Sequence, residues 1–357
     1  MKIGVDASSL IAQKTGIGSF ASHLLEEFDR SPQGIDFIRL GPRVSGDMNT
    51  PQRLYWEALA LPSLAKKAQA DILYSPGFSP PPAGKLKRIV TVHDVIGLLF
   101  PRNVGAASRF YWTHWLPGNL KKAHKLVASS ECTKRDLVRL LGLPAERIEV
   151  VPLAVRESFR VLDGGARAAQ AAKKYGVPGR YLMSVSSLEP RKNHLRLLKA
   201  FEKLRRDVPD MSLVIIGKPA GAEGELKAFL AEKDMESSVK LLGYVPEEDV
   251  ISLYSGALGY VMISLYEGFG LPALEAMNCG LAGIVADNSS LPEVTGDTAL
   301  RVNPGNDEAI EEALRTLVRD DGLRKKMGAE ALVRSRQFSI QKTASRMIEI
   351  FKREYSS

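Results

Sequence analysis

Short runs with the character of buried strands alternate with helical patterns along the whole chain, and this alternation constrains its fold most. In the first half the strand candidates are Lys2–Asp6, Asp36–Leu40, Ile72–Ser75, Arg88–His93, Lys125–Ser129 and Ile148–Pro152. The series restarts with Tyr181–Ser186, Leu213–Gly217, Val239–Leu242, Gly259–Ile263 and Gly283–Ala286. Strands that alternate with helices form parallel sheets, because each helix returns the chain to the edge where the previous strand began. The sequence therefore predicts an α/β protein.

The chain is long enough for two such domains. At 357 residues it exceeds the size at which a single hydrophobic core usually stops growing. The stretch 156–179 carries charge, alanine and glycine without a buried-strand pattern, so we place a domain boundary there. We expect one doubly wound domain over residues 1–165 and a second over 166–338. No short internal repeat is apparent. The helical candidates of the first half include 18–28, 55–69, 106–123 and 131–140.

The positive charge of the chain is concentrated in its first half. Residues 1–160 hold 22 Lys and Arg against 14 Asp and Glu, a difference of +8, whereas residues 161–357 hold 27 of each. Such asymmetry favours an anionic partner for the first half. Because no base-reading motif is present, an anionic lipid surface or a phosphate-bearing lipid acceptor fits better than nucleic acid. Residues 109–125 mix aromatic and basic side chains as an interfacial segment would. Pro117-Gly118 interrupt this segment, and a core-facing helix with a basic cap explains it equally well.

Several kinds of functional site are excluded because the sequence does not contain the motifs that they require. Only Cys132 and Cys279 are present, and their wide separation fits no metal or redox spacing and favours a reducing compartment. No two aspartates stand two residues apart, so an Asp-x-Asp metal clamp is not indicated. The N-terminus lacks a signal-peptide layout, and no apolar run reaches the roughly 18 residues of a membrane span. We expect a cytoplasmic protein that needs no metal or other cofactor.

The segment Glu267-Gly-Phe-Gly-Leu-Pro-Ala-Leu-Glu275 carries the strongest indication of chemistry. It follows the buried strand pattern at 258–264, and Gly268 and Gly270 let the backbone approach a ligand closely. Pro272 fits the first turn of a helix, whose free N–H groups form an anion site. A carboxylate on each side of a phosphate-binding turn suits a ligand with hydroxyls at both ends and phosphate between them. A nucleotide sugar has this chemistry.

This segment resembles the E-x7-E motif of the retaining, nucleotide-sugar-dependent glycosyltransferases of family 4. Further motifs of that family follow in the expected order along nearly the whole chain: Thr15-Gly-Ile-Gly18, His93-Asp94, Glu189-Pro-Arg-Lys-Asn193 and Gly243-Tyr-Val245. The resemblance implies the GT-B fold, in which two Rossmann-like domains face each other across a cleft. It implies that the first domain binds the acceptor and the second the nucleotide sugar. It also implies that the C-terminal helix, 339–357, packs back on the first domain.

The resemblance assigns roles to five residues. Glu267 is expected to contact hydroxyls of the transferred sugar, and Glu275 to hold the ribose hydroxyls of the donor. Arg191 and Lys192 are expected to neutralise the departing diphosphate in place of a metal. His93 is expected near the sugar, where its carbonyl or ring stabilises charge at the anomeric carbon.

The remaining site residues belong to the donor pocket and the acceptor side. The donor-binding residues that the resemblance implies are Gly16, Gly18, Ser187, Gly217, Lys218, Tyr244, Val245, Gly268, Phe269, Gly270 and Leu271. The backbone near Val245 is expected to pair with the edge of the base. Asp94 is expected on the acceptor side or as the residue that orients His93.

The combined motifs look most like bacterial mannosyl- and rhamnosyltransferases of surface-polysaccharide assembly. The resemblance implies retaining transfer of a hexose, mannose or rhamnose, from a GDP-sugar to a lipid-linked glycan in O-antigen or lipopolysaccharide synthesis. The enzyme would lie peripherally at the inner face of the cell membrane. A UDP-sugar-dependent transferase and a sugar-nucleotide epimerase of similar fold are the alternatives. A nicotinamide dehydrogenase ranks lower because Ala21 stands where the dinucleotide fingerprint needs its third glycine.

Overall fold

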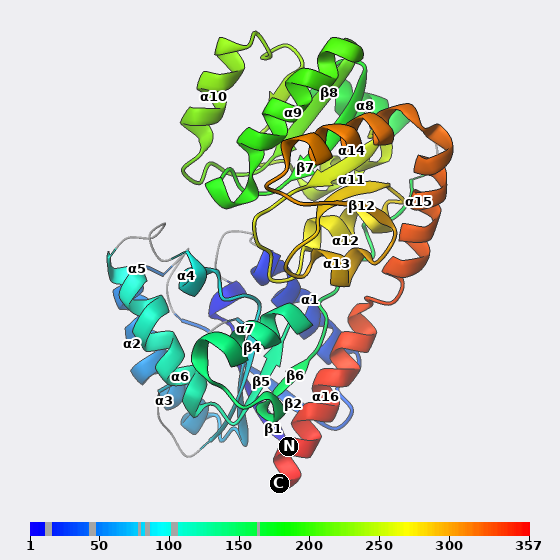
Figure 1. Cartoon of the computed structure of the whole chain (residues 1–357). Helices are drawn as coiled ribbons and strands as arrows, with labels where there is room; N and C mark the ends of the chain where they lie inside the picture. The colour runs from blue at the N-terminus through cyan, green and yellow to red at the C-terminus, as the bar shows by residue number, and fades with distance from the viewer. Residues whose placement is uncertain (11–15, 43–47, 78–79, 83–85, 101–105, 163–164) are drawn as a thin grey trace. The chain divides into compact units, whose positions relative to one another are not determined.

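The computed structural model describes residues 1–10, 16–42, 48–77, 80–82, 86–100, 106–162 and 165–357, and Figure 1 traces the chain. Thr15 of the Thr15–Gly18 motif lies outside the described residues. Contacts divide the chain into two compact units: unit 1 comprises Met1–Ala154 with Phe338–Ser357, and unit 2 comprises Val155–Gln337. This division comes earlier than the boundary expected at 165/166. Part of the expected linker already packs in unit 2, where the rings of Phe159 and Tyr254 lie 6.4 Å apart.

Unit 1 is built on a six-stranded parallel sheet with the order β2-β1-β3-β4-β5-β6. Its strands are β1 (Lys2–Asp6), β2 (Asp36–Leu40), β3 (Ile72–Ser75), β4 (Lys87–Val92), β5 (Lys125–Ala128) and β6 (Ile148–Val150). Ile3 of β1 pairs with Phe37 on one side and with Ile72 on the other, so the order of strands reverses between β1 and β3. All six strands were predicted within one or two residues.

Unit 2 contains a second six-stranded parallel sheet, with the order β12-β11-β10-β7-β8-β9. Its strands are β7 (Arg180–Val185), β8 (Met211–Ile216), β9 (Val239–Leu241), β10 (Gly259–Met262), β11 (Gly283–Ala286) and β12 (Ala299–Val302). Every residue of β8 is buried, because helices cover both faces of a doubly wound sheet. The order of strands reverses between β7 and β10. The edge strand β12 was not predicted.

The helices begin and end where local capping residues allow. In unit 1 they are α1 (Gly16–Arg30), α2 (Thr50–Tyr55), α3 (Leu61–Lys67), α4 (Ile96–Leu99), α5 (Ala106–Phe110), α6 (Leu116–Lys122), α7 (Glu131–Leu141) and α16 (Ile340–Ser356). In unit 2 they are α8 (Ala166–Lys174), α9 (His194–Asp207), α10 (Glu223–Glu232), α11 (Glu247–Gly256), α12 (Leu271–Asn278), α13 (Leu291–Thr295), α14 (Asp307–Arg319) and α15 (Asp321–Ser335). Ser130 caps the N-terminus of α7, where its side chain accepts the N–H of Thr133, and the left-handed Gly142 caps the C-terminus.

The structure reveals a duplicated helical segment in unit 1. The π-helical turn η2 (Trp56–Ala60) joins α2 to α3, and the π-helical turn η4 (Tyr111–Trp115) joins α5 to α6. Each turn leads into the same sequence pattern, Leu-Pro-x-x-x-Lys-Lys-Ala, at 61–68 and at 116–123. The expectation that the chain has no internal repeat was therefore wrong. The pattern is short, and only the matching helices make it recognisable.

Proline explains why both copies contain a π turn. Pro62 and Pro117 have no N–H, and their rings would press on the carbonyl four residues earlier in a regular α-helix. The turn widens instead, and the preceding leucine bonds five residues back: Leu61 N–H donates to Trp56 O, and Leu116 N–H to Tyr111 O. Neither these helices nor any other in the described part of the chain combine the length and apolar character of a membrane span.

The C-terminal helix α16 closes the core of unit 1. Phe351 is fully buried, and its ring lies 5.9 Å from that of Phe28, 6.1 Å from that of Phe37 and 5.1 Å from that of Tyr74. At the end of the helix, Lys87 Nζ donates to the carbonyl of Glu354 at 2.6 Å. The last helix thus completes a core begun by strands at the other end of the sequence.

We predict that Phe351→Ala lowers the free energy of unfolding of unit 1 by about 3–5 kcal/mol, because it leaves a cavity among three aromatic rings. Chemical denaturation monitored by circular dichroism measures the change. Tyr355→Ala, at a position 52% exposed on the same helix, is the control and should stay within about 0.5 kcal/mol of the parent. Equal effects of the two substitutions would contradict this account.

Candidate functional site

The carboxyl ends of β7 and β10 are the first place to look for a site in unit 2. In doubly wound sheets, ligands bind beyond the carboxyl ends of the strands, where the order of strands reverses. The loop after β7 contains Arg191 and Lys192 in a single turn of 3-10 helix, η6 (Pro190–Lys192). The loop after β10 contains Glu267. The sheet therefore brings together residues that are about 75 positions apart in the sequence.

Asn193 and the backbone hold these two loops against each other. Leu265 N–H donates to the carbonyl of Arg191 at 2.8 Å. Asn193 adopts a left-handed conformation, with φ of 63°, and its side-chain amide donates to Ile263 O at 3.2 Å and Pro304 O at 2.9 Å. Asparagine tolerates this conformation better than most residues. The last residue of the Glu-Pro-Arg-Lys-Asn motif thus fixes the geometry of the site.

Glu267 forms a buried ion-pair cluster with the two cations of the facing loop. Lys192 Nζ lies 2.6 Å from Glu267 Oε1, and Arg191 Nη1 lies 3.4 Å from Oε2. Burial alone would raise the pKa of Glu267, but the charges of Lys192 and Arg191 outweigh it and hold the pKa below its usual range. Glu267 is therefore a carboxylate at neutral pH.

Arg191 is more deeply engaged with the protein than the sequence suggested. It is buried, its Nη1 donates to the carbonyl of Tyr266, and its Nη2 donates to Glu189 Oε1 at 2.7 Å. Ser187 Oγ donates to the same oxygen of Glu189 at 2.8 Å. Sequence reasoning missed Glu189, although it stands inside the motif. These contacts make Arg191 an anchor for the Tyr266–Glu267 backbone.

The glycine turn after Glu267 depends on a residue without a side chain. Gly270 caps α12 in a left-handed conformation with φ of 104°, and a Cβ there would lie 2.7 Å from Leu291 Cδ2. Ser289 and Ser290 hold the backbone of Glu267: its N–H donates to Ser289 Oγ, and its carbonyl accepts from Ser290 Oγ, both at 3.0 Å. These serines were not predicted; the only signal was a polar pair between a strand and a Leu-Pro helix start.

Glu275 has the opposite environment from Glu267. Among the described residues, no hydrogen bond or ion pair to its side chain is found. Burial, with a smaller contribution from the negative charge of Glu247, raises the pKa of Glu275 to about 8. Its helix packs near α11, where Tyr254 Oη donates to Pro272 O at 3.3 Å. Glu275 is thus an acceptor group without a protein donor.

Three loops at the carboxyl edge of the sheet are bonded to one another beside this cluster. Ser186 N–H donates to Ile216 O at 2.9 Å, and Gly217 N–H to Gly243 O at 2.9 Å. Gly217 cannot be replaced without movement, because a Cβ would lie 1.8 Å from the carbonyl oxygen of Ser186. The structure therefore gathers five of the residues implied for donor binding, Ser187, Gly217, Lys218, Tyr244 and Val245, at this edge. Tyr244 is exposed, whereas Val245 is buried.

In unit 1, His93 lies at the carboxyl end of β4 as a neutral residue. Its Nε2 lies 2.6 Å from Pro76 O, so Nε2 carries the proton and Nδ1 does not. Its ring packs edge-on against Phe20 with centroids 5.7 Å apart. Burial lowers the pKa of His93 to about 4, against the smaller opposing effect of the Pro76 bond. A positively charged imidazole is thus excluded at neutral pH.

The expected roles of His93 at the sugar and of Asp94 beside it stay predictions, and the structure shows several groups that hold His93 in place. Its carbonyl oxygen, expected to face an anomeric carbon, accepts from Ser129 Oγ at 2.7 Å and from Thr133 Oγ1 at 3.3 Å. Asp94, expected on the acceptor side or as the residue that orients His93, accepts the N–H of Ile96 at 2.9 Å and caps the turn that follows. Pro76 orients the ring.

The first turn of α1 lies beside the end of β3. Gly16 and Gly18 stand in this turn, and a Cβ on Gly77 would approach Ile17 Cγ2 to 3.3 Å. The glycine loop, the Pro76–Gly77 segment and His93 therefore form one neighbourhood in unit 1. It lies at the reversal point between β1 and β3.

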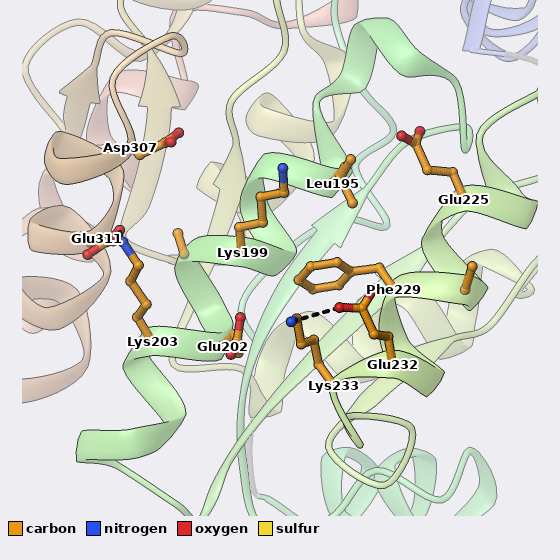
Figure 2. Close-up of a pocket in the computed structure, with 12 residues that line it drawn as sticks. Leu195, Lys199, Glu202, Lys203, Glu225, Phe229, Glu232, Lys233, Asp307 and Glu311 are labelled. Atoms are coloured by element: carbon orange, nitrogen blue, oxygen red, sulfur yellow. Dashed lines mark hydrogen bonds and ion pairs between the residues drawn. The ribbon is translucent and has the colours of Figure 1, made fainter.

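A surface groove elsewhere in unit 2 is a poorer candidate. It has a volume of about 640 Å³ and lies between α9, α10 and α14, as Figure 2 shows. Two of its lysines are paired with carboxylates: Lys203 with Glu311, and Lys233 with Glu232 at 2.8 Å. None of the residues singled out from the sequence lines it. In the described ranges, no group of three His, Cys, Asp or Glu side chains is placed to hold a metal ion.

Known proteins are similar to this chain over most of its length. The family described as "Glycosyl transferases group 1" matches residues 169–334, and "Glycosyltransferase Family 4" matches residues 19–159. The O-antigen chain mannosyltransferase B of Escherichia coli is 31% identical over 284 residues, covering 79% of this chain and 74% of that protein. The serotype-specific mannosyltransferase WbdA of Escherichia coli is 30% identical over 273 residues. That match covers 75% of this chain but only 33% of WbdA.

Solved structures show the same fold. Sucrose-phosphate synthase from Thermosynechococcus elongatus superposes with a TM-score of 0.82 at 16% identity, covering 100% of this chain and 99% of that one. Both the α/β class and the GT-B architecture of two Rossmann-like sheets are thereby confirmed.

We predict that Glu275→Gln stabilises the protein at alkaline pH. The native state keeps a proton on Glu275 up to a pKa of about 8, whereas the unfolded chain loses it near 4.5. The native state therefore binds more protons in this interval, and stability falls as the pH rises through it. The Tm of Glu275→Gln should match that of the parent near pH 5 and exceed it at pH 9. A difference in Tm that does not vary with pH would refute the assigned environment.

Proposed function

This chain belongs to the group 1 and family 4 glycosyltransferases, and we propose that it moves a mannosyl residue from GDP-mannose to a lipid-linked glycan with retention of configuration. GDP-rhamnose is the second donor in this proposal. The observation that carries it is the pairing of Glu267 with Lys192 and Arg191 at the strand reversal. The glycine-capped helix beside it bears Glu275, whose side chain receives no hydrogen bond from the described residues. Each part of a nucleotide sugar has a complementary group there.

The ribose and the transferred hexose lie at opposite ends of the donor, and each requires a carboxylate with a different environment. Ribose hydroxyls are donors, and Glu275 offers oxygens to which no residue that the structure describes donates a hydrogen bond. The hydroxyls of the transferred hexose require a permanently ionised acceptor near the reacting carbon, and Glu267 is ionised because Lys192 and Arg191 lower its pKa. Tyr244 and Val245, on the loop after β9, would flank the base.

The diphosphate is the leaving group, and its developing charge must be stabilised. Lys192 carries a single point charge that already bonds Glu267 and can turn toward a phosphate. The first turn of α12 adds N–H groups behind Gly270. We propose that these groups make a metal or other cofactor unnecessary. Arg191 contributes its charge while it anchors Tyr266 and Glu267 in place.

Retention follows from attack on the face that the diphosphate leaves. Glu267 is held by two cations and so is a weak nucleophile, which favours direct transfer over a covalent intermediate. In the proposed step the bond to the phosphate oxygen breaks, an oxocarbenium-like centre forms, and the acceptor hydroxyl attacks from the same face. The departing phosphate takes the acceptor proton.

Similarity to O-antigen mannosyltransferases supports the choice of sugar and acceptor. We propose that the acceptor is a growing surface polysaccharide on a lipid carrier, and that the enzyme works peripherally at the inner face of the membrane. A UDP-sugar donor is the alternative for the same site.

We predict that GDP binds in calorimetry without added metal, and at least about tenfold more tightly than UDP or ADP. Glu275→Ala should weaken this binding by about 10–100-fold, because the ribose loses its acceptor. Since ribose hydroxyls favour the ionised carboxylate, binding near pH 7 should release protons, and the measured heat should depend on the buffer. Preference for UDP would overturn the donor, and no binding of any nucleoside diphosphate would overturn the site.

We predict that substitution of Lys192 and substitution of Arg191 have different effects on kcat and on Tm. Lys192→Gln should lower kcat about 10²–10³-fold, because the leaving group loses a charge. Arg191→Gln should lower Tm further than Lys192→Gln, because Glu189 and the Tyr266 carbonyl also lose their donor. Initial rates with GDP-mannose and thermal unfolding of both variants measure this. An equal fall in Tm would contradict the distinction.

A further inference from the structure

The segment 265–267 brings Glu267 into the site of unit 2 from the end of β10. Because β10 has already ended, the segment lies beyond the ladder of the sheet, and its backbone groups need other partners. Arg191 provides two of them: its carbonyl accepts from Leu265 N–H at 2.8 Å, and its Nη1 donates to Tyr266 O. Three more partners come from the loop that follows β11.

That loop, here called the serine loop, consists of Asn288, Ser289 and Ser290. Asn288 Nδ2 donates to Leu265 O at 2.9 Å. The N–H of Glu267 donates to Ser289 Oγ, and Ser290 Oγ donates to the carbonyl of Glu267, both at 3.0 Å. Ser289 Oγ also donates to Asn288 Oδ1 at 3.2 Å, so its hydroxyl accepts one bond and donates another, and each bond polarises the next. The serine loop thus bonds both backbone groups of Glu267.

Ser289 makes these bonds from an unfavourable backbone conformation. Its φ is 53°, in the left-handed region that few residues other than glycine, asparagine and aspartate adopt. Such residues cluster at functional sites, where the surrounding contacts hold them in place. Glycine would adopt this conformation without steric cost, but it has no hydroxyl. The conformation of Ser289 therefore indicates that the hydroxyl is needed at this position.

The residue after the serine loop supports the glycine turn as well. Leu291 begins α13 and is fully buried, and a Cβ on Gly270 would lie 2.7 Å from its Cδ2. The helix α13 packs on α12, as Figure 1 shows. The chain from Asn288 to Leu291 therefore contacts the turn both at Glu267 and at the start of α12.

We propose that Ser289 is a positioning residue for recognition of the transferred sugar. It fixes the backbone of Glu267 so that the carboxylate, held by Lys192 and Arg191, meets two adjacent hydroxyls of the hexose. This assignment rests on the function proposed above for Glu267. A carboxylate displaced by about 1 Å loses most of that directional bonding. GDP contains no hexose, so its binding does not depend on Ser289.

The test compares two substitutions that both remove the hydroxyl. Ser289→Ala keeps the unfavourable φ, whereas Ser289→Gly relieves it, so the glycine variant should have a Tm about 2–4 °C above that of the alanine variant. Calorimetry without an acceptor measures the affinities for GDP and for GDP-mannose. Both variants should bind GDP as the parent does and GDP-mannose about tenfold more weakly. A residue that only stabilised the fold would give losses that follow Tm.

Two further variants are the controls. Asp234 also has a left-handed φ, of 50°, and lies exposed before β9 in unit 2. Asp234→Gly should bind both GDP and GDP-mannose with the affinities of the parent. Glu275→Ala should weaken the binding of GDP and of GDP-mannose by the same factor, because the two ligands share the ribose.

A second measurement needs no ligand. The N–H of Glu267 is protected by Ser289 Oγ, so hydrogen exchange of this amide should be about tenfold faster in both Ser289 variants than in the parent. Exchange at Glu267 in Asp234→Gly should equal that of the parent.

Unchanged exchange at Glu267 in the two Ser289 variants would overturn the assignment, whatever the ligands do. A loss of GDP-mannose affinity in Ser289→Ala that Ser289→Gly restores would also overturn it. A parent that binds neither GDP nor GDP-mannose would refute the proposed function, and the assignment with it. A parent that binds both, with Ser289 variants that bind GDP-mannose equally well, would refute the assignment alone.

Discussion

The buried contact between Glu267 and the two cations of the opposite loop is the interaction on which the site of unit 2 depends. Removing three charges from water is costly unless they pair closely, and here each charge has a partner. The pairs fix the loop after β7 against the loop after β10, and the Arg191 contact with Tyr266 O adds a backbone anchor. The charges of this cluster therefore neutralise one another before the donor binds. A diphosphate must therefore compete with Glu267 for Lys192, and the freed carboxylate can then accept from sugar hydroxyls.

Glu267 and Glu275, eight residues apart, thus have pKa values shifted in opposite directions. Glu267 is a carboxylate because cations surround it, whereas loss of contact with water and the negative charge of Glu247 raise the pKa of the half-buried Glu275 to about 8, and no described residue donates a hydrogen bond to it. The raised pKa of Glu275 lowers stability at neutral pH, and such a cost is common at sites that bind a ligand. The site therefore contains one acceptor, Glu267, that is already ionised, and a second, Glu275, that we expect to gain hydrogen bonds when the ribose binds.

Much of the fold could be predicted from the sequence, because buried parallel strands are continuous apolar runs and need little context to be recognised. The strand β12 was not predicted because it is a short edge strand in which only Ala299 and Val302 are buried. The duplicated π turns were not predicted because an eight-residue pattern with five shared residues is too weak a signal without the matching helices. The role of Asp94 stays a prediction, because a carboxylate after a strand suits capping and orienting equally well; the structure shows that Asp94 caps the turn at Ile96 and that His93 contacts Pro76 O at 2.6 Å.

The sequence by itself determined the α/β class, the doubly wound order of elements, the family, and the residue types of the site, since these follow from periodicity and from motifs a few residues long. The tertiary structure alone decided which groups meet. It paired Glu267 with cations about 75 residues away, made Arg191 an anchor for the Tyr266 backbone, and left Glu275 without a hydrogen bond from any described residue. The physical reason is that pairing, burial and pKa depend on neighbours that only the packing of parallel strands and their crossover helices brings together.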